Sequence, residues 1–177
     1  MEKVEKMKKK TLSYLCKRAV ELGAKKAKII AASSVKTAPW VRYKCQFGCD
    51  GYGGCLTCPP NSPTPEQTQK IIDSYSKAIL IHTPSGWKVD ISGTVSKLEK
   101  EAFLAGYYKA FGMGAGPCRL CRECDWKNGC RHADKARPAM EACGIDVFQT
   151  ARNNGFTINT VDSLQCKASY FGLVLIE

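Results

Sequence analysis

Apolar residues recur at helical spacing near the start of the chain. Leu12, Leu15, Cys16 and Ala19 follow the i, i+3, i+4, i+7 pattern, which predicts an amphipathic helix within the first 22 residues. Gly23 follows this stretch, and glycine is the usual residue just after a helix end. Because Cys16 lies within the apolar stripe, we expect it to be a core thiol rather than a metal ligand.

The rest of the chain alternates predicted helices with predicted strands. Thr64 and Gln67 form a capping-box pattern with Pro65 between them, so a helix is expected to begin there. A longer helix is expected from about Thr94 to Phe111, with an apolar stripe of Leu104, Tyr107, Tyr108 and Phe111. Strands are predicted over residues 27–32, 40–44, 78–82, 145–148 and 168–176, a turn over 84–86, and short helical segments over 135–142 and 149–154.

This alternation predicts an α/β fold: a single compact domain over residues 1–177, with a small mixed sheet, flanking helices and two Cys-rich loops. The length of 177 residues fits one domain, and 44% hydrophobic with 24% charged residues is typical of a folded globular chain. The aliphatic runs at 78–81 and 173–176 are too short to cross a bilayer, so no membrane insertion is expected. The charged N-terminus leads into no apolar segment of a signal peptide, which favours a cytoplasmic location.

Cysteine changes the picture most, because the chain has 11 of them. An odd number of cysteines without a secretion signal argues against a disulfide framework. In a reducing compartment, thiols that cluster along the sequence are more often metal ligands. Eight of the cysteines fall in two such clusters.

Cys118, Cys121, Cys124 and Cys130 form the second cysteine group, which carries the stronger signal. Cysteines at i, i+3 and i+6 can wrap one corner of a cubane, and bacterial-type ferredoxins use the same spacing. Structural zinc prefers two separate pairs, so we favour a [4Fe-4S] cluster and keep Zn²⁺ as the alternative. For the fourth ligand we favour Cys130, which is nearest, over the competing Cys143, and His132 is a weaker candidate.

Cys45, Cys49, Cys55 and Cys58 form the first cysteine group, within a glycine-rich stretch that ends in Pro59. Glycines let this backbone turn tightly and bring N–H groups near sulfur. An iron–sulfur cluster is again favoured, although two zinc-binding pairs fit this spacing as well. Cys166 falls on the apolar side of an alternating segment, so we expect a buried thiol. Setting aside Cys16, Cys143 and Cys166 leaves two sets of four.

At this point the chain resembles an uncharacterised prokaryotic family of predicted metal-binding proteins, common in anaerobes and archaea. The segments that carry the resemblance are residues 49–60, 97–111, 116–124, 130–138 and 140–147. The resemblance implies that the cysteines hold metal, in the form of iron–sulfur, and it implies no particular reaction. The family pattern matches Cys45, Cys49 and Cys58, and Cys55 is additional here. Without Cys55, the first cluster would have three thiolates and one open iron able to bind substrate; with it, the cluster is closed and suits electron transfer.

Our leading hypothesis is an electron-transfer or redox-accessory protein with two [4Fe-4S] clusters, docking on a larger acidic redox protein or a corrinoid methyltransferase-type system. The net charge of +11, much of it near the N-terminus, favours such a partner; the basic residues there are Lys3, Lys6, Lys8, Lys9, Lys10, Lys17, Arg18, Lys25, Lys26 and Lys28. The first alternative is an iron–sulfur enzyme with an open iron at Cys45, Cys49 and Cys58. The second is a zinc-stabilised structural or nucleic-acid-binding module, which is weaker because no RNA- or DNA-binding motif occurs.

Overall fold

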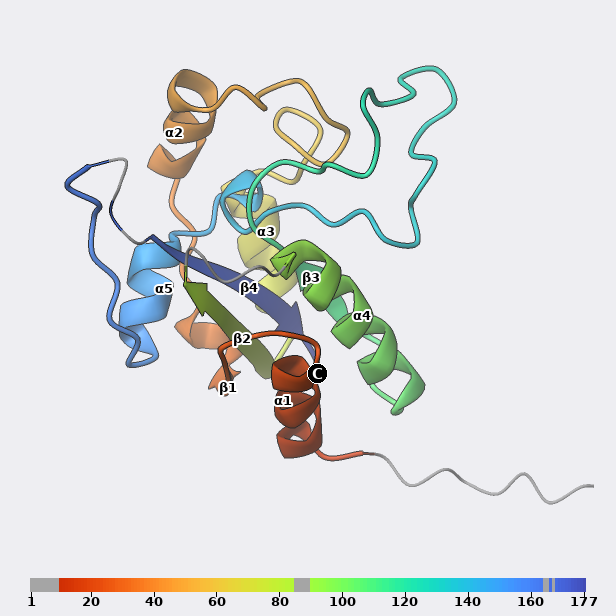
Figure 1. Ribbon diagram of the computed structural model, residues 1–177, viewed down its shortest axis with the longest axis vertical. Helices are drawn as coiled ribbons and strands as arrows, with labels where there is room; N and C mark the ends of the chain where they lie inside the picture. The colour runs from red at the N-terminus through yellow and green to blue at the C-terminus, as the bar shows by residue number, and fades with distance from the viewer. Residues whose placement is uncertain (1–9, 85–89, 164–165, 167) are drawn as a thin grey trace, which may run out of the picture.

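The computed structural model describes residues 10–84, 90–163, 166 and 168–177, which form a four-stranded sheet covered by helices (Figure 1). The strands are β1 (Lys26–Ala31), β2 (Lys77–Pro84), β3 (Phe111–Met113) and β4 (Ser169–Leu175), in the order β1-β2-β4-β3. The predicted α/β class is confirmed. Neighbouring strands of this sheet all pair antiparallel, whereas we expected a mixed sheet. A parallel contact occurs only as an isolated bridge between Gly114 and Ala139 in the described residues.

Two layers of helix cover the sheet. The α-helices are α1 (Leu12–Glu21), α2 (Trp40–Gly48), α3 (Pro65–Ile72), α4 (Ile91–Leu104) and α5 (Val147–Asn153), with short 3-10 turns η1 (Ala32–Ser34) and η2 (Glu141–Cys143). Helices α1 and α4 pack on the face that carries Ile79 and Ile81, while α3, α5 and η2 pack on the face that carries Leu80 and Leu173. Since successive strand residues point to opposite faces, the central strands β2 and β4 are buried on both sides.

Several predicted elements are confirmed at their expected positions. Thr11 caps α1, and Thr64 and Gln67 form the expected capping box of α3. Strands β1, β2 and β4 and helix α5 lie close to their predicted bounds. The first nine residues, with the basic Lys3, Lys6, Lys8 and Lys9, and the turn beyond Pro84 lie outside the described residues. The single-domain assignment for residues 1–177 stays a prediction.

Other sequence predictions are wrong, mostly where a short apolar run fits both the helical and the strand periodicity. Residues 40–44 were expected to be extended, but they begin helix α2, in which Val41 is buried and Cys45 follows one turn later. Helix α4 ends at Leu104 rather than Phe111, because Gly106 takes a left-handed conformation (φ 95°). Of the stripe expected there, only Tyr107 is buried.

The region before α5 also differs from the prediction. Residues 135–142 form turns that end in η2 instead of a short helix. The predicted strand over 145–148 is reduced to one bridge between Ile145 and Thr37, because Asp146 caps helix α5 through the Gln149 N–H.

Candidate metal centre

Two cysteine-rich loops lie side by side at the end of the molecule that carries α2 (Figure 1). One follows α2 and the other leaves β3. The long second loop is closed at its base, because Gly114 N–H donates to the Pro138 carbonyl (2.8 Å) and Met140 N–H to the Gly114 carbonyl (3.0 Å). Gly114 packs so closely on Ser92 that a Cβ there would lie 2.2 Å from the Ser92 Oγ. The sheet edge therefore fixes where the second loop begins and ends.

A largely buried ion pair anchors the far end of the second loop. The Arg137 guanidinium donates two hydrogen bonds to the Glu99 carboxylate of α4, at 2.5 and 2.6 Å, and the two side chains are each 13% exposed. Arg137 also donates to the carbonyls of Ala133 and Ala136, and the pKa of its guanidinium is raised by the hydrogen bonds to Glu99. The ion pair thus joins the turn after Cys130 to the core helix.

Helix α2 presents the first cysteines. Val41 and Cys45 are four residues apart, so they lie on one side of the helix, and Val41 is buried. Cys49 follows in an extended conformation at the C-terminal end of the helix. The guanidinium of Arg42 donates to the carbonyls of Ser62 (3.0 Å) and Pro63, which ties α2 to the end of the first loop. Within the loop, Gly53 N–H donates to the Pro59 carbonyl (2.8 Å), with Gly53 at φ 70°.

The thiols of Cys45, Cys49 and Cys58 line a cavity of about 640 Å³, here called the large cavity. Burial raises the pKa of the Cys45 and Cys58 thiols, and Cys49 raises both further. These three groups are therefore close enough to affect one another's charge.

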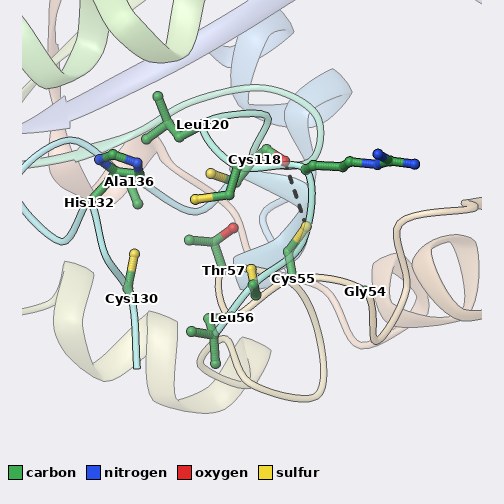
Figure 2. Close-up of a pocket in the computed structure, with 12 residues that line it drawn as sticks. Gly54, Cys55, Leu56, Thr57, Cys118, Leu120, Cys130, His132 and Ala136 are labelled. Atoms are coloured by element: carbon green, nitrogen blue, oxygen red, sulfur yellow. Dashed lines mark hydrogen bonds between the residues drawn. The ribbon is translucent and has the colours of Figure 1, made fainter. Parts of the chain in front are cut away.

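The second cysteine group lines a separate cavity of about 60 Å³, here called the small cavity. Its thiols are those of Cys118, Cys121, Cys124 and Cys130, and the His132 ring also lines it. Cys55 joins this group: its Sγ lies 3.6 Å from the Cys118 carbonyl oxygen, as Figure 2 shows. Burial raises the pKa of Cys55 to about 11, with further contributions from Cys58, Cys124 and Cys118.

The sequence grouped Cys55 with Cys45, Cys49 and Cys58, whereas the structure places three of those thiols at the large cavity and Cys55 at the small one. The Cys55 and Cys58 side chains nevertheless lie close enough to shift each other's pKa, so the two cavities meet at this pair. The role of all eight cysteines as ligands stays a prediction.

The three remaining cysteines differ in their surroundings. Cys143 is 2% exposed, and burial raises its pKa to about 12. Cys16 is half-buried against the core between α1 and α4, as expected. Cys166 is exposed, which corrects the prediction of a buried thiol; hydrogen bonding to Ser163 lowers its pKa. The expected alternating strand does not begin until Ser169, so nothing turns Cys166 inward.

The sequence reasoning missed Glu141 and Lys44, which both line the large cavity. Glu141 is an exposed residue, yet the protein around its carboxyl desolvates the group and raises its pKa. Its carboxyl lies near enough to Cys45 and Cys143 to raise the pKa of both thiols. The sequence did offer one indication of Glu141: the residue lies in the segment 140–147, one of those that carry the family resemblance.

The donor set fits a thiolate-bound metal group, although its geometry is not that of a single ion. No three His, Cys, Asp or Glu side chains in the described part of the chain are arranged to hold one metal ion. The thiols line two hollows instead of converging on a point. Sulfur donors in this number are typical of zinc and iron–sulfur sites rather than of magnesium or calcium.

An α/β fold with cysteine-rich loops gathered at one end defines a thiol-rich metal-binding class of protein. The chain belongs to the family described as predicted metal-binding protein (DUF2284), whose model matches residues 28–176. This match confirms the resemblance found in the sequence. No curated protein and no solved structure gives a significant match to the chain. Among the described residues, no helix has the length and apolarity needed to traverse a lipid bilayer.

Proposed function

We propose that this metal-binding protein is an iron–sulfur redox protein with two [4Fe-4S] clusters, one at each cysteine-lined cavity. The observation that carries the proposal is the division of eight thiols between two adjoining cavities. Cys45, Cys49 and Cys58 would hold one cluster. Cys118, Cys121 and Cys124 would hold the other, with Cys55 or Cys130 as the fourth ligand.

The spread of the thiols favours clusters over zinc. A zinc ion draws four ligands to within about 2.3 Å of one point. A four-iron cluster binds each cysteine through a different iron, so its ligands surround a volume. Thiols that line a hollow without converging fit the second arrangement better. The N–H of Gly51 also donates to the Cys49 Sγ (3.4 Å), and such bonds tune cluster potential.

The chain around the cavities suits electron transfer. Bound clusters would supply one-electron oxidation and reduction. The neighbouring Cys55 and Cys58 side chains, one at each cavity, bring the two sites close together. Leu56, Thr57 and Ala136 line the small cavity and limit its contact with water.

An acidic redox partner would dock at the second loop. Exposed cationic side chains follow this loop around the small cavity, at Arg119, Arg122, Lys127, Arg131 and Lys135. Association driven by these charges should weaken as salt concentration rises. The loop thus adds a docking surface to the basic N-terminus considered above.

One observation also favours an iron–sulfur enzyme. With Cys55 turned to the small cavity, only three thiols line the large cavity, and that cavity has room for a small molecule. A cluster held by three thiolates keeps one iron free to bind substrate. The two functions are compatible, since one cluster would relay electrons to the other.

The test is anaerobic purification followed by iron, sulfide and zinc analysis, with absorption and electron paramagnetic resonance spectra. We expect about eight irons per chain. Cys55→Ser and Cys130→Ser would each be compared with Cys166→Ser, an exposed cysteine outside both cavities. The fourth ligand is the residue whose replacement alters the iron content or spectrum. A colourless protein with stoichiometric zinc would refute the proposal.

A further inference from the structure

The large cavity exceeds what a metal site alone requires. Its volume of about 640 Å³ lies within the range of small-molecule pockets, roughly 300–1,000 Å³, whereas the small cavity measures about 60 Å³. Its wall also includes Phe148 of α5, Ile158 and Tyr170 of β4, which come from outside the cysteine loops. The cavity therefore reaches from the thiols to the side of the sheet covered by α5.

Aromatic side chains left open to solvent gather at this cavity. Trp40, Tyr52 and Tyr170 all line it and are between 38% and 49% exposed. Large apolar side chains that remain exposed around a concave surface are typical of a binding site. Flat rings favour a flat partner, because offset stacking and edge contacts between aromatic rings add to the burial of apolar surface.

The polar groups at the cavity define the other half of the ligand. Asp146 lines it, but its carboxylate is already engaged by the Gln149 N–H (2.8 Å). The exposed Lys44 and Glu141 line it too, and the Glu141 carboxyl lies beside the Cys45 thiol and accepts a hydrogen bond from its own backbone N–H. A carboxyl oxygen accepts a hydrogen bond whether or not the group is ionised, so the cavity offers an acceptor to a ligand group that donates a hydrogen bond.

We propose that the large cavity binds a flat nitrogen heterocycle, with its ring against Trp40, Phe148 and Tyr170 and an N–H donated to the Glu141 carboxyl group. The inference deepens the proposed function and rests on it in one respect. A metal held by Cys45, Cys49 and Cys58 would bind the second nitrogen of the heterocycle. The aromatic wall and Glu141 belong to the chain whatever metal is bound.

The experiment compares benzimidazole with imidazole by calorimetry on the anaerobically purified protein. Both probes have one nitrogen lone pair and one N–H, and only benzimidazole has the extra apolar ring. We expect benzimidazole to bind at least tenfold more tightly, because its additional ring is buried in the cavity. Spectra of the reduced protein recorded with each probe report separately on contact with the metal.

Variants assign the preference to the cavity wall. Trp40→Ala should weaken benzimidazole binding at least fivefold and leave imidazole binding unchanged. Tyr43→Ala is the matched control, because Tyr43 is an exposed aromatic residue on the same helix that does not line the cavity. Tyr170→Ala provides a second variant on another element that lines the cavity. Glu141→Leu should weaken both probes, since both donate an N–H and leucine has no acceptor.

The possible failures are distinguishable. Equal affinity for the two probes in a protein with full iron content would overturn the cavity proposal and leave the redox proposal standing. The cavity proposal would also be overturned, and the redox proposal left standing, if the Trp40→Ala and Tyr170→Ala variants bind benzimidazole as tightly as the parent protein. A protein without iron that retains the preference for benzimidazole would overturn the redox proposal and support the cavity.

Discussion

Replacing Glu99 with Ala should destabilise the protein far more than the same change at Glu101. The two carboxylates lie two residues apart on α4, and each accepts two hydrogen bonds from an arginine. They differ in their surroundings: Glu99 and Arg137 are each 13% exposed, whereas Glu101 and Arg18 are 31% and 29% exposed. The pair of variants therefore compares one kind of interaction at two degrees of burial, although Glu99 also accepts from the Gly112 N–H and Arg18 also pairs with Glu21.

The magnitude follows from the groups that each substitution leaves without a partner. Removing one member of a buried ion pair strands the other charge and costs about 3–5 kcal/mol. Glu99→Ala also removes the acceptor of the Gly112 N–H (2.8 Å), worth about 1 kcal/mol more. Since small domains are stable by only about 5–15 kcal/mol, this loss is large. Arg18 stays open to water, so Glu101→Ala should cost much less.

Urea denaturation of the metal-free, reduced protein, followed by circular dichroism, measures the difference. A double variant, Glu99→Met with Arg137→Met, should recover most of the stability, because it leaves no unpaired charge in the core. Similar losses for Glu99→Ala and Glu101→Ala, or a double variant no more stable than Glu99→Ala, would refute the reasoning.

Three further predictions concern single positions. Gly144→Ala should destabilise the fold by at least about 1–2 kcal/mol, because a Cβ there would lie 2.5 Å from the Pro65 Cγ; Gly155→Ala, with the same φ of 75° and only a 3.7 Å contact, should cost less in the same denaturation assay. Burial, followed by the charge of Lys26, lowers the pKa of His82, so folding favours its neutral form. The stability of the fold should therefore fall as pH drops below about 6.5. His82→Gln should flatten this pH dependence in thermal melts from pH 8 to 5. Cys143→Ala should keep its full metal content at a cost of about 1 kcal/mol, because the thiol lies in the core; loss of metal would instead make Cys143 a ligand.

The sequence predicted helix caps, apolar helix stripes and strands correctly where these features depend on residues a few positions apart. The Thr64 capping box, the Leu12–Ala19 stripe and the strand at the C-terminal end each involve residues a few positions apart, and the structure has all three. The wrong predictions fall where a short apolar run is compatible with both a helix and a strand. Residues 40–44 form a helix because tertiary packing buries Val41, and no local signal decides that.

The cysteine spacing by itself determined that two loops of this chain are rich in metal-ligand chemistry, and the family match agrees. Only the tertiary structure decided which thiols face which cavity. Cys55 lies three residues from Cys58 in the chain, yet it turns to Cys118 across the gap between the loops. The aromatic wall and Glu141 likewise come together from α2, η2, α5 and β4. Sequence spacing describes one segment at a time, whereas a cavity is made where the packing of the sheet brings distant segments together.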